Sequence, residues 1–148
     1  LERAEAYALS GKYAEALKDI NTELTAFSKK KVQLTLDKIK DFYNSQAYYT
    51  PTKPTPKKAL NPLFAIEKTT QEPLLQCLLQ LRRILTIHEG FRLQDVKRYG
   101  ITMYRRQVDV QSKVNALTDS MKVGDPRLAI QLPQDVISAG ITPNPRNK

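Results

Sequence analysis

The sequence of 148 residues contains no tryptophan, one cysteine and one histidine. A single cysteine, Cys77, excludes an internal disulfide, and with His88 it cannot supply the four ligands of a structural zinc site. If residues 73–88 form one helix, these two residues lie roughly 16 Å apart along it, which excludes a cysteine–histidine catalytic dyad. Within PLLQCLLQLRRIL we expect Cys77 to be a buried thiol. No metal site, cofactor or catalytic residue is predicted here.

Phosphate-binding loops and membrane spans are also missing. The five glycines form neither a GxGxxG nor a GxxxxGK[ST] motif, so no loop that cradles a nucleotide phosphate is predicted. No apolar run reaches the roughly 18 residues of a transmembrane helix. The chain opens at Leu1 inside a helical pattern, and we expect it to be a piece of a longer protein.

Positive charge is the main excess of the composition. Lysine and arginine total 24 against 15 acidic residues, for a net charge of +9. Such a surplus favours encounter with polyanions, but the basic residues are spread along the whole chain, which is typical of a solvated surface. The stretches KRYG and Tyr104-Arg105-Arg106 place basic residues beside aromatic ones. No recognised nucleic-acid-binding module surrounds them, so no nucleic-acid partner is expected.

The first 27 residues predict two antiparallel helices joined by a tight turn. Apolar and small residues recur at helical spacing in LERAEAYAL and again in YAEALKDINTELTAF. Gly11 lies between the two stretches and suits the left-handed conformation that ends a helix. Small Ala4 and Ala16 let the helices approach closely, and Tyr7 and Tyr13 are expected to fill the remaining space.

A short helix and a long loop are predicted next. Residues 34–44 carry apolar side chains at helical spacing, and Thr35 is placed to cap the first turn. Residues 45–70 include PTKPTPKK, which forbids a continuous helix. A loop of this length in a compact domain is usually functional or packed over a neighbour.

Residues 73–100 predict a long helix followed by a charged segment. The helix is expected to run to about His88 and to be buried between layers, because its apolar residues cover more than one face. Residues 101–148 are predicted to form a charged loop, a short extended segment at 128–132 ended by Pro133, and a tail with no packing signal.

These elements predict a mainly α fold, with tetratricopeptide-like helical pairs, long irregular loops and a short extended C-terminal segment. The tetratricopeptide unit places small residues, a turn glycine and aromatics at offsets similar to those of Ala4, Tyr7, Gly11, Tyr13 and Ala16. One such unit cannot bury its own faces, so neighbouring helices are expected.

The stretch EGFRLQDVKRYG, residues 89–100, offers two carboxylates, Glu89 and Asp95. A glycosidase uses such a pair. However, Glu89 with Arg92, and Arg92 with Asp95, fall at the i,i+3 spacing of helical ion pairs. We therefore expect a local salt-bridge network that fixes the loop after the long helix, and no catalytic role.

Three stretches in series resemble the SusD/RagB family. LERAEAYALSGKYAEALKDIN resembles a family repeat of the form RAEAYxxxGxYxEALxDIN, and the ending DPRLAIQLPQDVISAGITPNPRN resembles the closing segment through Arg127, Leu132, Pro133 and Asn144-Pro145. LRRILTIHEGFRLQDVKRYG resembles the signature ERRxELxFEGxRxxDLxRxG. The matching signature residues are Arg82, Arg83, Glu89, Gly90, Arg92, Asp95, Arg98 and Gly100. Leu81, Leu85 and His88 depart from the signature.

The resemblance implies that residues 1–148 are the C-terminal region of a lipid-anchored protein on the outer face of the outer membrane. Family members capture oligosaccharides, or in some cases peptides, and cover a TonB-dependent β-barrel transporter. They are not enzymes. The ligand-binding loops and the lipidated cysteine are expected upstream of this region, so no ligand-binding residue is assigned.

Three other functions remain open from the residues. The first alternative is an intracellular helical-repeat adaptor that binds a protein partner through its basic surface. The second is a nucleic-acid-binding domain, whose affinity would fall steeply with salt. An enzyme is the least favoured, because no catalytic constellation is visible.

Overall fold

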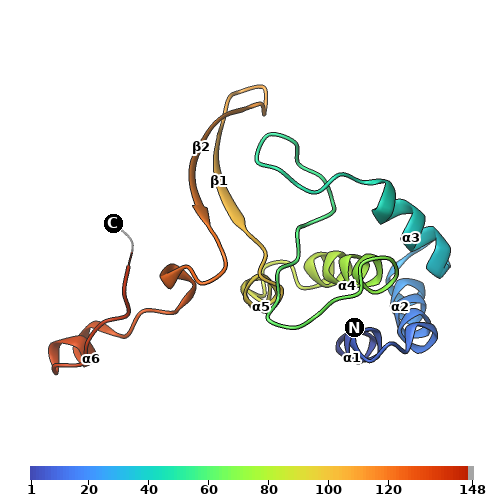
Figure 1. Cartoon of the computed structure of the whole chain (residues 1–148), viewed down its shortest axis with the longest axis horizontal. Coiled ribbons are helices and arrows are strands. Elements are labelled where there is room, and N and C mark those ends of the chain that lie inside the picture. Colours follow the sequence, from blue (N-terminus) through green and yellow to red (C-terminus); the bar gives the residue numbers. More distant parts are fainter. Residues whose placement is uncertain (147–148) are drawn as a thin grey trace.

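A computed structural model describes residues 1–146 (Figure 1). The elements follow the order α1 (Glu2–Leu9), α2 (Tyr13–Phe27), α3 (Leu36–Ser45), α4 (Gln71–Leu85), α5 (Arg92–Arg98), β1 (Met103–Val108), β2 (Val114–Met121), the 3-10 helix η1 (Pro126–Leu128) and α6 (Gln134–Ser138). Helices α1 to α4 gather at one end of the molecule, and the segment carrying α6 extends beyond the hairpin of β1 and β2. None of the described helices is long and apolar enough to cross a bilayer.

The prediction of a mainly α fold is wrong. Helices make up 43% of the chain, and a two-stranded antiparallel sheet makes the fold mixed α/β. The strands lie within residues 101–148, where a charged loop was predicted, and pair Met103 with Met121 and Arg105 with Asp119. Most of their side chains are polar or exposed, so no alternating apolar face marks the strands in the sequence.

The turn of the hairpin is fixed by Asp109. Its carboxylate accepts hydrogen bonds from the backbone N–H groups of Gln111, at 2.8 Å, and Lys113, at 2.9 Å. Ser112 takes a positive φ of 61°. An aspartate that binds the backbone two residues ahead is a common turn signal. It was present in the sequence as VDVQSKV.

The predicted extended segment at 128–132 is not a strand. Residues 126–128 form η1, whose start is capped by Asp125, and α6 follows Pro133. The tail is largely exposed, but hydrogen bonds join it to residues 130–131: the Asn144 amide donates to the Ile130 carbonyl at 2.6 Å, and the Asn144 N–H donates to the Gln131 side chain at 2.9 Å. These contacts are side chain to backbone and leave no periodic pattern.

The predicted pair of antiparallel helices is present as α1 and α2. Ala4 and Ala16 are completely buried where the two helices meet. Gly11 has φ of +75°, and the N–H of the next residue returns to the Tyr7 carbonyl at 2.8 Å. Tyr7 and Tyr13 are half-buried against this core. Local sequence is sufficient to specify this element, because its turn and its contact face lie within 27 residues.

Helix α4 is the centre of the core and contacts α1, α2 and α3. Leu74, Leu75 and Leu78 are buried along its first half. The predicted burial of the whole stretch 73–88 is wrong for the second half, because Ile84 is 56% exposed and Ile87 is 67% exposed. The helix begins two residues before Pro73 and ends at Leu85.

Side chains cap the first turns of α3 and α4; the cap of α3 was predicted from the sequence and that of α4 was not. Thr35 accepts from the Lys38 N–H, as predicted for α3. Helix α4 instead begins under the carboxylate of Glu67, which accepts from the N–H groups of Thr70, at 2.7 Å, and Gln71, at 3.0 Å. Hydrogen bonds from Thr69 and these N–H groups lower the pKa of Glu67 to about 2. A carboxylate also suits the positive end of the helix dipole.

The proline-rich loop between α3 and α4 packs over the helices. The Gln76 side chain on α4 accepts from the Lys58 N–H at 3.0 Å and donates to the Lys58 carbonyl at 2.5 Å. Further along, the Asn61 N–H donates to the Tyr99 carbonyl at 2.8 Å, after α5. The loop is therefore held to both α4 and α5.

The close approach of the loop depends on Gly100. Its φ is +58°, and an added Cβ would lie 2.1 Å from the carbonyl oxygen of Asn61. Gly90 also has a positive φ, +78°, but nothing lies within 4 Å of its would-be Cβ. At Gly100 both the positive φ and the lack of space favour glycine, whereas at Gly90 only the positive φ does.

This contrast predicts different costs for two alanine substitutions. Gly90→Ala should lower the free energy of unfolding by about 1–2 kcal/mol, the usual cost of a left-handed non-glycine residue. Gly100→Ala should cost clearly more, because the backbone of residue 61 must also move. Urea unfolding of both variants measures the difference, and equal costs would contradict the packed loop.

Candidate functional site

A buried ion network joins α1, α4 and α5. Glu5 projects from α1, Arg82 from the last turns of α4, and Asp95 from α5, with Tyr99 just after it. All four side chains are buried. Glu5 is at least 77 positions away from the other three in the sequence, and the packing of three helices brings them together.

Arg82 is the centre of this network. One terminal nitrogen of its guanidinium lies 2.6 Å from an Asp95 oxygen, and the other donates to Glu5. The Tyr99 hydroxyl donates to the second oxygen of Glu5, which also lies 3.2 Å from Nε of Arg98. A planar guanidinium with five donors suits such a shared position better than lysine.

Two edges of the network are weaker. Nε of Arg82 lies 3.0 Å from Glu2, yet the contact lacks hydrogen-bond geometry and is an electrostatic one only. Oδ2 of Asp95 has no hydrogen-bond partner among the described residues, and the Arg92 guanidinium lies 3.9 Å away. Arg92 therefore attracts Asp95 without a direct hydrogen bond.

The contacts of the network shift the pKa values of Glu5 and Tyr99 away from neutral pH. Burial alone would raise the pKa of Glu5, but the Tyr99 hydroxyl and the Arg82 guanidinium together lower it. Burial and the Glu5 carboxylate raise the pKa of Tyr99. Glu5 thus stabilises the fold above its ordinary pKa, and this contribution is lost as the pH falls through the lowered value. Near pH 7, Glu5 is therefore charged and the Tyr99 hydroxyl is neutral.

The structure separates the signature residues into different roles. Arg82, Asp95 and Arg98 meet in the network, Gly90 and Gly100 serve backbone conformation, and Arg83 is exposed on α4. The predicted Glu89–Arg92 pair is wrong, because Glu89 forms no ion pair with any described residue. Residues 86–91 form a turn between α4 and α5, so the helical i,i+3 spacing does not apply to Glu89.

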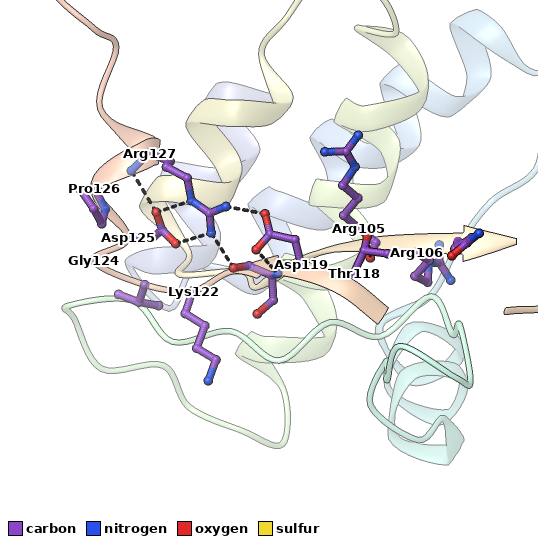
Figure 2. A pocket seen from close by; sticks show the side chains of 12 residues that line it. Arg105, Arg106, Thr118, Asp119, Lys122, Gly124, Asp125, Pro126 and Arg127 are labelled. Atoms are coloured by element: carbon purple, nitrogen blue, oxygen red, sulfur yellow. Dashed lines mark hydrogen bonds and ion pairs between the residues drawn. The ribbon is translucent and has the colours of Figure 1, made fainter. Parts of the chain in front are cut away.

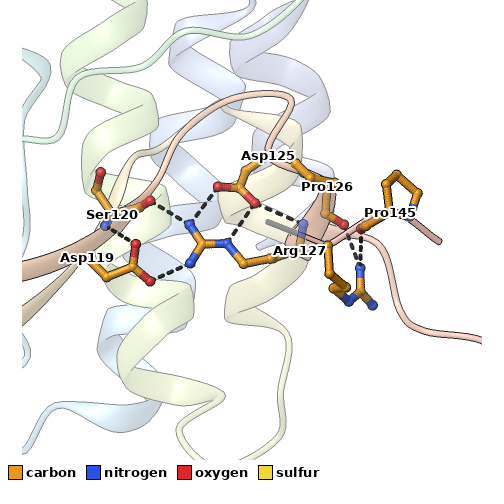
Figure 3. A network of polar contacts seen from close by, with 7 residues as sticks. Asp119, Ser120, Asp125, Pro126, Arg127 and Pro145 are labelled. Atoms are coloured by element: carbon orange, nitrogen blue, oxygen red, sulfur yellow. Dashed lines mark hydrogen bonds and ion pairs between the residues drawn. The ribbon is translucent and has the colours of Figure 1, made fainter. Parts of the chain in front are cut away.

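A polar pocket of about 1040 Å³ lies between the hairpin and the C-terminal segment (Figure 2). Arg127, one of the residues that carried the resemblance, forms one wall. Its guanidinium lies 2.7 Å from Asp125, also contacts Asp119, and donates to the Ser120 carbonyl at 2.7 Å (Figure 3). Arg127 therefore ties the end of β2 to η1.

The pocket leaves few of its polar groups free for a ligand. The Arg127 guanidinium donates to Asp119, Asp125 and Ser120, and hydrogen bonds from the side chain and backbone of Arg127 lower the pKa of Asp125 to about 2. The remaining cations of the lining are Arg105, Arg106 and Lys122, and no aromatic side chain lines it. We interpret the polar groups of this pocket as structural, because several of them hold Arg127 in place.

A second group of charges, the basic–aromatic cluster, consists of Lys58, Arg83, Arg92, Arg106, Tyr49 and Tyr104. The Lys58 ammonium lies 3.3 Å from the centre of the Tyr49 ring, and the Arg106 guanidinium lies 5.4 Å from it. The rings of Tyr49 and Tyr104 stack with centres 5.9 Å apart. Sequence reasoning noted Tyr104 and the neighbouring arginines, but it missed Tyr49 and Lys58, because only the packed loop brings them there.

Among the described residues, Cys77 and His88 contribute to no candidate metal site. Burial raises the pKa of the Cys77 thiol to about 11, so the thiolate is scarce at neutral pH. Within residues 1–146, no group of three histidine, cysteine, aspartate or glutamate side chains could hold a metal ion.

Comparisons with protein-family models, with curated proteins and with solved structures found no match. The SusD/RagB resemblance consequently rests on the residues of this sequence, and it stays a prediction.

The network predicts unequal roles for two arginines on neighbouring helices. Arg82→Met should lower the free energy of unfolding by about 3–5 kcal/mol, because it leaves the buried Glu5 and Asp95 unpaired. Arg92→Met, which keeps a similar packing volume, should cost less than about 1 kcal/mol, because its contact to Asp95 is long. Urea unfolding at pH 7 compares them, and equal losses would show that Arg82 is not the centre.

Lys58 should titrate unlike the other lysines. Its partial burial and the charges of Arg83, Arg92 and Arg106 lower its pKa to about 8, from 10.5. We therefore expect its amine to begin reacting with acetic anhydride at lower pH than exposed Lys29, as followed by mass spectrometry across a pH series. Stability should also rise between about pH 8 and 10.5, where the unfolded state binds this proton and the folded state does not. A Lys58 titration in the ordinary lysine range would contradict the crowding of charges.

Proposed function

We propose that this chain is the C-terminal scaffold of a non-enzymatic, cell-surface nutrient-binding protein of the SusD/RagB type. In this proposal the complete protein is lipid-anchored on the outer face of the outer membrane. It captures an oligosaccharide, or a peptide, and passes it to a TonB-dependent β-barrel transporter. The ligand loops and the lipid anchor belong to residues upstream of Leu1.

One observation carries the proposal. The first two stretches that resemble the family are far apart in the sequence, and the buried network connects them directly. Glu5 belongs to the first stretch and Arg82 to the second, 77 positions away. Asp95 and Arg98, two more signature residues, bind the same pair. The resemblance concerns each stretch separately and does not require this contact, so the contact supports the proposal.

The third stretch is organised around its own matching residues. Arg127 ties β2 to η1, and Asn144 holds the tail against residues 130–131. Each side chain donates to one backbone carbonyl: Arg127 to that of Ser120 (Figure 3) and Asn144 to that of Ile130. Arg127 and Asn144 thus connect neighbouring segments by hydrogen bonds, as expected for a scaffold.

In this proposal three buried groups, Glu5, Tyr99 and Cys77, have structural roles, and their pKa shifts agree with such roles. Glu5 has a lowered pKa, and the pKa values of Tyr99 and Cys77 are raised, so none of the three exchanges protons near neutral pH. General acid–base catalysis needs a group whose pKa lies near the working pH.

Localisation and partner together test the proposal. Antibodies against this chain should label intact cells of the native organism, and external proteinase K should remove the signal while a cytoplasmic marker survives. Detergent extracts of outer membranes should yield the full-length protein together with a β-barrel transporter after immunoprecipitation.

A protein that is protected in intact cells and purifies without a barrel would contradict the proposal. The intracellular adaptor hypothesis would then take its place, since the basic–aromatic cluster offers a charged surface for an acidic protein partner. Lysed cells treated with the same protease serve as the control for antibody access.

A further inference from the structure

We propose that the basic–aromatic cluster is a binding site for one oxyanion group, sulfate or phosphate, either as the free ion or as an ester on a larger ligand. This inference rests on the side chains of the cluster and stands whether or not the proposed function holds. Its crevice shares no lining residue with the pocket beside Arg127, although Arg106 of the cluster lines that pocket and Arg92 lies 3.9 Å from Asp95 of the buried network.

Four cations from four different segments converge in the cluster. Lys58 comes from the proline-rich loop, Arg83 from α4, Arg92 from α5 and Arg106 from β1. Lys58, Arg83 and Arg92 line one narrow crevice. Lys58 and Arg106 approach the same ring, that of Tyr49. No single amphipathic pattern creates this arrangement, because it is assembled by tertiary packing.

The positive charge of the cluster is poorly compensated. Arg83 and Arg106 form no ion pair with any described residue, and Arg92 only reaches Asp95 at 3.9 Å. That carboxylate is already bound to Arg82 at 2.6 Å. The Lys58 ammonium donates to the Thr55 carbonyl at 3.1 Å. In the buried network, by contrast, Arg82 contacts two buried carboxylates.

Mutual repulsion of this kind costs stability. Burial, first, and then the neighbouring arginines lower the pKa of Lys58, while burial and Arg83 lower the pKa of Arg92. A bound anion removes that repulsion and restores the ordinary preference for the charged forms. An oxyanion suits the cluster because several of its oxygens accept hydrogen bonds at once from different guanidinium groups.

The crevice sets the size of what enters. Its volume is about 10 Å³, room for about one water-sized atom. The Gln80 side chain also lines it and makes no hydrogen bond with another described side chain or backbone group. One oxygen of the anion would occupy the crevice beside Lys58 and Gln80. The other oxygens would remain at the mouth, within the reach of exposed Arg83.

The aromatic rings serve to place the cations. The Lys58 ammonium lies 3.3 Å from the centre of the Tyr49 ring, and the Arg106 guanidinium lies 5.4 Å from it. The Tyr49 ring also stacks on Tyr104, with an angle of 19° between the rings. Cation–π contacts hold ammonium and guanidinium groups over a ring. With its ring engaged in this way, Tyr49 is not free to stack on a nucleobase. The cluster therefore favours a charged group over a nucleic-acid base.

Titration with sodium sulfate, inorganic phosphate, glucose 6-sulfate and glucose 6-phosphate tests the site, with sodium chloride at matched ionic strength and glucose as blanks. NMR amide shifts should be saturable and confined to residues near 58, 83, 92 and 106. The pKa of Lys58, followed by trace acetylation, should rise when the anion is bound. Tighter binding of the esters would identify a larger ligand as the source, and equal binding would identify the free ion.

Matched variants make the test specific. Arg83→Gln and Arg106→Gln should each weaken binding about tenfold, the effect of losing one charge-assisted hydrogen bond. Arg105→Gln removes the same charge from the adjacent, exposed position of β1 and should change affinity less than about twofold. The proposal is overturned if all three variants lose affinity equally, or if wild-type protein shows no saturable shift and no change in the Lys58 titration.

Discussion

The contact of Arg82 with Glu5 and Asp95 is the interaction on which the arrangement of the helices depends. It connects α1 and α5 to the end of α4, and its three side chains are buried. Removing three charges from water is costly, and the mutual attraction recovers that cost only when the geometry is satisfied. The network therefore acts mainly by penalising any packing in which these partners do not meet. Tyr99 adds to this constraint, because its buried hydroxyl also needs the Glu5 carboxylate.

The position of α5 also determines where the proline-rich loop packs, through a contact at Gly100. Once α5 is fixed against α4, the backbone after it accepts the Asn61 N–H from the proline-rich loop, and the missing side chain of Gly100 leaves room for that approach. Gln76 then fixes the loop at Lys58. The position of Lys58 beside Arg83 and Arg92 is thus a consequence of how the loop is held. The proposed anion site therefore depends on the scaffold, because the proline-rich loop that packs on α4 also carries Lys58.

Prediction from sequence succeeded where the determining contacts are local. The hairpin of α1 and α2 and the Thr35 cap of α3 each depend on residues a few positions apart. The two strands were missed because their faces are mixed and lack an alternating pattern, and the Asn144 contacts of the tail were missed because they follow no period. The i,i+3 rule found the weak Arg92–Asp95 attraction but could not reveal the Glu5–Arg82 pair. The available hint was a glutamate beside Ala4 on the face that meets the core, and it did not identify the partner.

A double-mutant cycle between Glu5→Gln and Arg82→Met measures whether the buried ion pair couples α1 to α4. Unfolding free energies of the wild type, both single variants and the double variant give the coupling between the two side chains. We expect a coupling of at least about 1 kcal/mol, so that the double variant loses less stability than the sum of the two single losses. Additive losses would show that Glu5 and Arg82 act independently, and the link between the two resembling stretches would then carry no weight.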